Sequence, residues 1–167
     1  NLNITYNQLE SYVNDNIDLT DKLLNLKYNH FIFLSSLAVY PDCLNKKIND
    51  RTNFYVKPRD IYATCKLISE INVKRKSKKF TILRTGGLLH KQCRPNSITR
   101  LINNKKIKLT LNGKSSFNYI LYEDLLCFIK IVLEKKLTGI FNICAKKNVN
   151  LEMVKKYFKS NNVTFGN

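Results

Sequence analysis

The sequence lacks the features that would assign it to a membrane-spanning or metal-binding class. No apolar run approaches the ~18–20 residues that a transmembrane helix requires, and the N-terminus has no apolar stretch preceding a small-residue cleavage site. Two histidines and five cysteines without a C-x-x-C pair do not assemble a convincing zinc-ligand set. We therefore expect a cytoplasmic protein with reduced thiols, no metal and no membrane association.

Acidic residues are also scarce, with 12 Asp and Glu against 29 Lys and Arg, for a net charge of +17. Such a charge attracts polyanions, so nucleic acid has to be considered. However, lysine outnumbers arginine by 23 to 6, whereas reading DNA grooves relies on arginine. The densest basic run spans residues 73–79. It is either a solvated connector, a patch that binds nucleic acid, or a segment that attracts a phosphorylated substrate. We favour the connector and do not expect nucleic acid as the partner.

The length of 167 residues suits one domain with a real hydrophobic core. The chain begins with Asn1 rather than Met, and we expect it to be a fragment of a longer protein.

Two apolar runs predict buried strands separated by a helix. Residues 31–34 are apolar and end at Ser35-Ser36, and residues 79–85 end at the pair Gly86-Gly87. Between them, a polar loop over 41–58 precedes a helix from Ile61 to about Asn72, with Asp60 as its cap. Strand, helix and strand in this order predict a βαβ unit with parallel strands, and hence an α/β fold.

The remaining periodicity predicts further elements on both sides of this unit. An amphipathic helix opens at Asp15 or Asn16 and runs towards Leu26. The other expected helices are 96–103, 123–135 and 151–158, and the other expected strands are 107–111 and 139–144.

Tyr62 and Lys66 form the most suggestive pair of side chains. Their four-residue spacing places both on one face of the predicted helix. A nearby ammonium favours the phenolate of a tyrosine, whose pKa is ordinarily near ~10, so this tyrosine could act as an acid or base. Taken alone the pair is weak, because a chain with nine tyrosines and 23 lysines is expected to contain one by chance.

The predicted strand ends strengthen the interpretation of this pair. Open parallel sheets bind ligands at the carboxyl edge of their strands, where Ser35-Ser36 and Gly86-Gly87 are expected. A hydroxyl, a phenol and an ammonium would then meet in one crevice, which suits proton transfer beside a hydride carrier.

These segments resemble a known family. SSLAVY at residues 35–40, YATCK at 62–66 and Glu70 resemble the extended short-chain dehydrogenase/reductases, and more narrowly the NAD-dependent epimerase/dehydratase group acting on nucleotide sugars. Three later segments agree in order and spacing: ILR at 82–84, NYILYED at 118–124 and GIFNI at 139–143. The resemblance covers roughly residues 10–158.

The resemblance implies a fold and a set of roles. The fold would be a partial Rossmann-type α/β domain with a doubly wound, mainly parallel sheet, its catalytic portion at about 1–90 and a small substrate-binding portion at about 91–167. Tyr62 would be the acid/base, Lys66 would bind the nicotinamide ribose and lower the pKa of Tyr62, and Ser36 would donate to the reacting oxygen. Asn16 and the backbone at Gly86 would contact NAD or NADP. The partner would be a nucleotide-sugar substrate. A second copy of the chain would be a further partner if the chain dimerises to cover an exposed sheet edge.

The chain also departs from the family. Its five glycines do not form the G-x-G-x-x-G turn that cradles the cofactor pyrophosphate. Thr85 stands where proline usually follows the strand arginine, and Phe117 stands where many members carry a phosphate-binding arginine.

Three hypotheses follow for the function. The chain is the catalytic and substrate side of a nucleotide-sugar epimerase, dehydratase or reductase. Alternatively, it is a non-catalytic remnant that needs a partner chain or dimerises to cover an exposed sheet. The third hypothesis, a basic nucleic-acid binder, rests on the charge alone.

Overall fold

A computed structural model describes residues 5–40, 61–103, 107–160 and 162–166. The expected loop over 41–58 and the cap at Asp60 lie outside these residues. The chain divides into two compact units. The first comprises residues 1–85 and 128–143, and the second comprises residues 86–127 and 144–167.

A parallel three-stranded sheet forms the centre of the first unit. Its strands β1 (Phe31–Ser36), β2 (Phe80–Thr85) and β7 (Gly139–Ile143) lie in the order β1-β2-β7. Helix α3 (Ile61–Lys76) follows β1 and precedes β2, which confirms the predicted βαβ unit. After β1, a short 3-10 turn spans Leu37–Val39.

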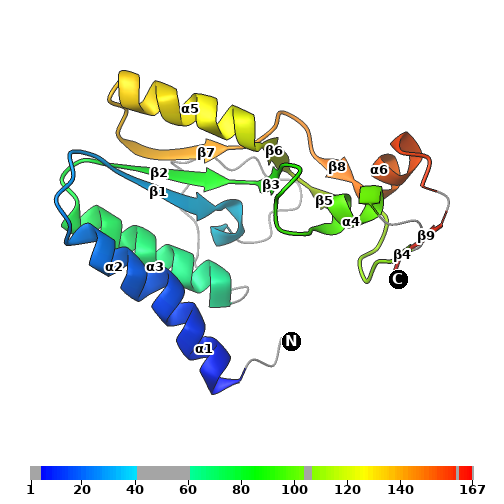
Figure 1. Cartoon of the computed structure of the whole chain (residues 1–167), viewed down its shortest axis with the longest axis horizontal. Coiled ribbons are helices and arrows are strands. Elements are labelled where there is room, and N and C mark those ends of the chain that lie inside the picture. Colours follow the sequence, from blue (N-terminus) through cyan, green and yellow to red (C-terminus); the bar gives the residue numbers. More distant parts are fainter. Residues whose placement is uncertain (1–4, 41–60, 104–106, 161, 167) are drawn as a thin grey trace. The chain divides into compact units, whose positions relative to one another are not determined.

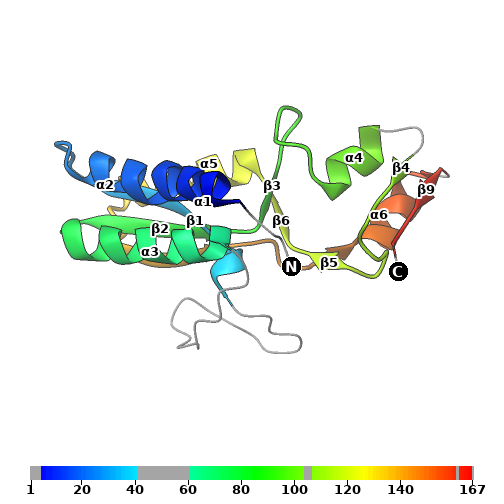
Figure 2. The same cartoon turned by 90° about the horizontal axis from the view of Figure 1, so that it is seen from below.

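Helices cover the sheet on both sides. Helix α1 (Tyr6–Val13), a π-helical turn (Asn14–Asp18) and α2 (Leu19–Leu24) lie beside α3 (Figures 1 and 2). Helix α5 (Tyr122–Glu134) lies on the opposite side of the sheet (Figure 1). The core between the sheet and the first helices contains Leu24, Phe33, Val73 and Ile82.

The predicted start of the first helix at Asp15 or Asn16 is wrong. The Thr5 side chain accepts a hydrogen bond from the Gln8 backbone N–H, and the Gln8 side chain accepts one from the Thr5 backbone N–H. This reciprocal capping box satisfies two orphan donors and begins the helix at Tyr6.

The second unit is built from helices and short strand pairs around its own core. Strand β3 (Gly87–Leu89) pairs with β6 (Tyr119–Leu121), and β4 (Ile107–Lys108) with β9 (Val163–Thr164), both in parallel. Strand β5 (Ser116–Phe117) pairs antiparallel with β8 (Val149–Asn150). Helices α4 (Ser97–Asn103) and α6 (Leu151–Tyr157) enclose a core of Ile98, Leu101, Ile107, Leu109, Leu151, Val154 and Val163.

Substituting Leu83 by alanine tests the central position of β2. Its side chain is fully buried (0% exposed), so Leu83→Ala should lower the free energy of unfolding by about 2–5 kcal/mol. In the same unit, Leu133 is 54% exposed, and Leu133→Ala serves as the control with an expected change below about 1 kcal/mol. Urea denaturation measures both, and equal losses in the two variants would contradict the burial of Leu83 within β2.

Candidate active site

The pair Tyr62 and Lys66 lies on α3 as predicted. Tyr62 is the second residue of the helix, and its side chain remains 37% exposed. The Lys66 amine lies 5.8 Å from the centroid of the Tyr62 ring, within the range of a cation–π contact. The spacing in the sequence therefore does bring the ammonium and the phenol ring together.

The Lys66 amine is also tied to strand β1. It donates a 3.2 Å hydrogen bond to the Leu34 carbonyl and lies 5.1 Å from the centroid of the Phe33 ring. Burial among these groups lowers the pKa of Lys66 below its ordinary value, and the nearby Cys65 and Glu70 oppose that shift. An ammonium has three N–H donors, so the bond to Leu34 leaves donors for a ligand.

Ser36 ends β1 and begins the 3-10 turn. Its Oγ accepts a 3.1 Å hydrogen bond from the Ala38 backbone N–H, which caps the turn. A hydroxyl that accepts this bond keeps its own hydrogen for donation. Helix α3 packs against both β1 and the turn, so Ser36, Tyr62 and Lys66 belong to neighbouring elements of one unit.

Asn16 lies in the π-helical turn, a rare element that is frequent at functional sites. Its side-chain amide donates to the Tyr12 carbonyl at 3.0 Å. Its backbone carbonyl accepts bonds from the hydroxyls of Thr20 at 2.5 Å and Ser69 at 3.0 Å. Asn16 therefore joins this turn to α3, and its contact with a cofactor stays a prediction.

Gly86 belongs to the second unit, whereas the other predicted site residues belong to the first. A Cβ atom at Gly86 would come within 2.7 Å of the Asn118 carbonyl oxygen, so only glycine fits this close approach. Asn118 in turn accepts a bond from the Ala145 N–H and donates to the Ala145 carbonyl. The contact of the Gly86 backbone with a nicotinamide stays a prediction.

A buried polar network adjoins the candidate residues, and the sequence did not reveal it. Strand register places Ser35, Arg84 and Asn142 in one row across the sheet. Arg84 pairs with Glu70 of α3, one helical turn beyond Lys66. Glu70, Arg84 and Asn142 occur in the segments that carry the family resemblance, but no local pattern indicates that they meet.

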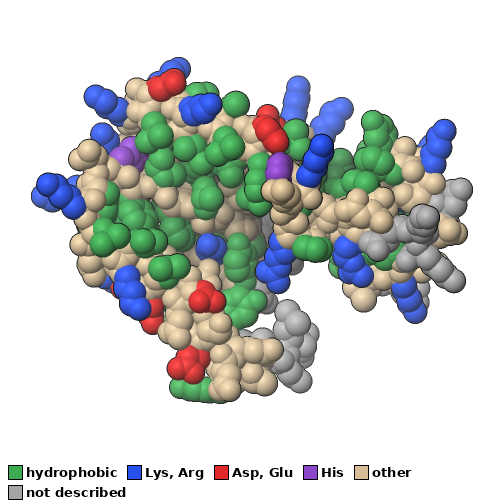
Figure 3. All heavy atoms as spheres, viewed as in Figure 1, with side chains coloured by type: hydrophobic (Ala, Val, Ile, Leu, Met, Phe, Trp, Pro, Cys, Tyr) green, Lys and Arg blue, Asp and Glu red, His purple; other side chains and the backbone are tan. Residues whose placement is uncertain are grey.

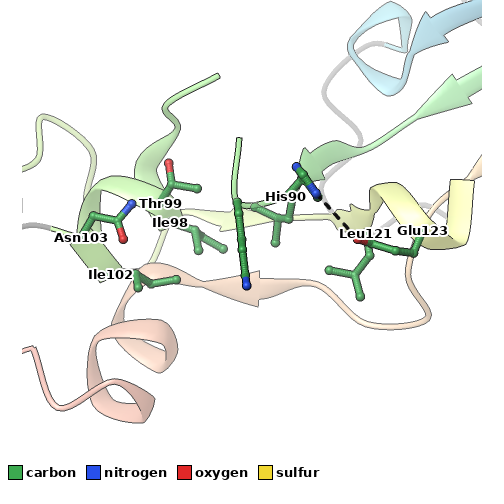
Figure 4. Close-up of a pocket in the computed structure, with 9 residues that line it drawn as sticks. His90, Ile98, Thr99, Ile102, Asn103, Leu121 and Glu123 are labelled. Atoms are coloured by element: carbon green, nitrogen blue, oxygen red, sulfur yellow. Dashed lines mark ion pairs between the residues drawn. The ribbon is translucent and has the colours of Figure 1, made fainter. Parts of the chain in front are cut away.

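The second unit holds a pocket of about 750 Å³ (Figure 4). Ile98, Ile102 and Leu121 supply apolar walls. His90 and Glu123 point toward one another, with Nε2 and Oε1 4.0 Å apart, and His90 stacks on the Tyr122 ring at 5.3 Å. Apolar walls with a few polar groups are typical of small-molecule sites.

Phe117 occupies a structural position in the second unit. It lies in β5 and packs against the core, with its ring centroid 6.0 Å from that of Tyr119.

The surface and the cysteines bear on the other sequence-based expectations. On the face shown in Figure 3, Lys and Arg side chains stand apart instead of forming one continuous patch within either unit.

The cysteines in the described ranges, Cys65, Cys93, Cys127 and Cys144, are free. Among the described residues, no helix combines the length and apolar character needed to cross a membrane.

The chain belongs to the NAD dependent epimerase/dehydratase family, whose sequence profile matches residues 3–144. This assignment confirms the resemblance found in the sequence. Among curated proteins, no significant match was found.

Solved structures share the fold at low sequence identity. A UDP-N-acetylglucosamine 4-epimerase from Methanobrevibacter ruminantium M1 is 18% identical with a TM-score of 0.77, covering 99% of this chain and 61% of that one. A UDP-glucuronic acid 4-epimerase from Bacillus cereus, in complex with UDP-glucuronic acid and NAD, is 24% identical with a TM-score of 0.76, covering 93% and 55%. A dTDP-4-dehydrorhamnose reductase from Clostridium acetobutylicum is 20% identical with a TM-score of 0.79, covering 98% and 62%.

These likenesses confirm the predicted partial Rossmann-type α/β fold. This chain spans only about three fifths of the length of those proteins.

Titration of Lys66 tests the electrostatics of α3. Removing the Glu70 charge takes away a group that favours the ammonium, so Glu70→Gln should lower the pKa of Lys66 further, and the amine should lose its proton at a lower pH than in the wild type. NMR of the Lys66 side chain measures this shift. Glu152→Gln on α6 is the matched control and should leave Lys66 unchanged. An unchanged or raised pKa in Glu70→Gln would contradict the assigned contacts.

Proposed function

We propose that this chain supplies the acid–base residues and the substrate side of an NAD(P)-dependent epimerase, dehydratase or reductase that acts on a nucleotide sugar. The observation that carries the proposal is the Lys66 amine beside the Tyr62 ring, tied to the strand that ends at Ser36. A phenol, an ammonium and a hydroxyl on neighbouring elements are suited to proton transfer at a sugar hydroxyl, which supports this proposal for a chain of this family.

Each residue has a defined part in this proposal. Tyr62 takes the proton from a sugar hydroxyl or returns it, and its partial exposure allows substrate to reach it. Lys66 stabilises negative charge on Tyr62 and binds a ribose hydroxyl with its remaining donors. Ser36 donates its hydrogen to the reacting oxygen.

The residues present fit the nicotinamide end of a dinucleotide. Lys66 keeps donors for the ribose, and Asn16 and the Gly86 backbone are the further proposed contacts. NAD(P)+ would supply the acceptor for hydride removed from the sugar carbon. The glycine-rich turn for the pyrophosphate is not in this sequence, so the chain would form only part of a cofactor-binding domain. The catalytic portion of that domain would be about residues 1–90.

The second unit would hold the sugar nucleotide. In its pocket, Ile98, Ile102 and Leu121 would contact flat or apolar groups of the substrate. His90 and Glu123 would form hydrogen bonds with its hydroxyls. The net charge of +17 would attract the phosphates of such a substrate. The Bacillus cereus neighbour was crystallised with UDP-glucuronic acid and NAD, which supports this substrate class.

Replacing Tyr62 by phenylalanine tests the acid–base role. In a preparation of the protein that turns over a nucleotide sugar, Tyr62→Phe should reduce kcat by about 10²–10⁴-fold, because it removes the group that transfers the proton. Cofactor affinity should persist, since the ring and Lys66 remain. Tyr157→Phe on α6, where the side chain is exposed, is the control. Unchanged turnover in Tyr62→Phe would refute the role.

A second candidate is that the chain works only with a complementary polypeptide. The run FIFL of β1 is typical of a strand covered on both faces and both edges. Within the described residues, however, β1 pairs only with β2, and Leu34 is 42% exposed. Hydrophobic side chains gather over the sheet of this unit in Figure 3. An edge of this kind favours pairing with a further strand.

Calorimetry with NAD+ tests the second candidate. If a complementary polypeptide is required, the 167-residue chain should show no heat of binding with NAD+, because it lacks the phosphate-binding turn. Tight binding by the chain alone would count against this second candidate. Sedimentation of the same sample would show whether two copies cover the exposed edge instead.

A further inference from the structure

The starting point is the buried ion pair between β2 and α3. Arg84 Nη2 lies 2.6 Å from Glu70 Oε2, and Arg84 Nε donates to Glu70 Oε1 at 3.0 Å. The two side chains are only 6% and 4% exposed. Two parallel bonds of this kind hold a guanidinium and a carboxylate in a single mutual orientation.

The pair extends to the segment that carries Ser36. Arg84 Nη1 donates to the Tyr40 hydroxyl at 2.8 Å, and that hydroxyl donates to Asn142 Oδ1 at 2.8 Å. Ser35 Oγ donates to Glu70 Oε1 at 2.5 Å. Ser35 and Tyr40 flank the turn that Ser36 caps, so the network holds this turn from both ends.

The same network holds the helix that carries the other two residues. Glu70 follows Tyr62 and Lys66 at successive four-residue steps along α3. Rotation or sliding of α3 would move the Glu70 carboxylate away from Arg84 and from Ser35. The orientation of α3 and the position of the turn are thereby set by the same two charged groups.

We propose that Arg84 and Glu70 are positioning residues that align Ser36 with Tyr62 and Lys66. The proposal rests on the proposed function, which assigns the chemistry to those three side chains. Neither Arg84 nor Glu70 needs to touch the substrate, since both act through the elements they join.

The energetics of buried ion pairs allow a role of Arg84 and Glu70 in positioning to be tested separately from a role in the stability of the fold. Replacing both partners by apolar residues of similar size is often neutral or stabilising, whereas removing one partner leaves a buried charge uncompensated. Apolar side chains would fill the same space, but they would not hydrogen-bond Tyr40 or Ser35. A double substitution can therefore remove the alignment while keeping the fold.

The test is the double variant Glu70→Met/Arg84→Met in the full chain. It should still unfold in one cooperative urea transition, with a midpoint lowered at most by the loss of the hydrogen bond from Ser35 to Glu70. Exchange of the Ala38 amide, which is bonded to Ser36 Oγ, should become about tenfold faster by NMR as that hydrogen bond weakens. The Met153 amide is the internal control, because it is capped in the same way by Asn150 in the other unit.

Lys66 provides a second reporter in the same sample, read at a pH at which its ammonium stays charged in both proteins, so that a change in its pKa does not contribute. Its side-chain signal should shift, because the bond to the Leu34 carbonyl depends on the placement of α3 against β1. Arg84→Lys, which keeps the charge but not the two parallel bonds, should show both effects more weakly.

The outcomes decide between alignment and stability. Unchanged Ala38 exchange and Lys66 signal in a folded double variant would overturn the proposal. Loss of the fold in that variant would show that the pair serves stability, and would overturn it as well. None of these readouts needs turnover. The acid–base assignment is tested separately by the turnover of Tyr62→Phe, so its failure can be distinguished from failure of this proposal.

Discussion

The alignment proposed for the first unit rests on one interaction, the pairing of two charges in its interior. Ionised side chains are costly to bury unless they are paired and fully hydrogen-bonded. Arg84 and Glu70 meet this condition, and no buried side-chain oxygen or nitrogen in the described part of the chain lacks a partner. Burial lowers the pKa of Arg84, but the hydrogen bonds that Arg84 donates to Glu70 and the negative charge of that carboxylate outweigh this effect, so the pKa of Arg84 stays above its ordinary value. Such a pair restricts orientation in a way that apolar packing does not.

The same pair influences the charge on the candidate lysine. Burial lowers the pKa of Lys66, and Glu70, one turn further along α3, acts in the opposite direction. The helix thus combines a partly desolvated ammonium next to a phenol ring with a fixed orientation, because Lys66 is buried against β1 and Glu70 is paired with Arg84 of β2.

Local patterns predicted the parts of the fold in which neighbours in the sequence are neighbours in space. The strands at β1 and β2, the helix between them and the contact of Tyr62 with Lys66 are of this kind. The start of α1 was missed although the Thr5 and Gln8 capping box was available as a signal. Strands β3, β5, β8 and β9 have two or three residues each, too few for a period-2 pattern to emerge.

By itself, the sequence determined the βαβ unit and the family, and it named the three candidate side chains on which the proposed function rests. The tertiary structure decided which distant groups meet: Tyr40 with Asn142 and Ser35 with Glu70, 102 and 35 residues apart. The physical reason is strand register. Pairing of β2 with both neighbours aligns Ser35, Arg84 and Asn142 in one row, and no spacing within a single helix or strand encodes a pairing between strands.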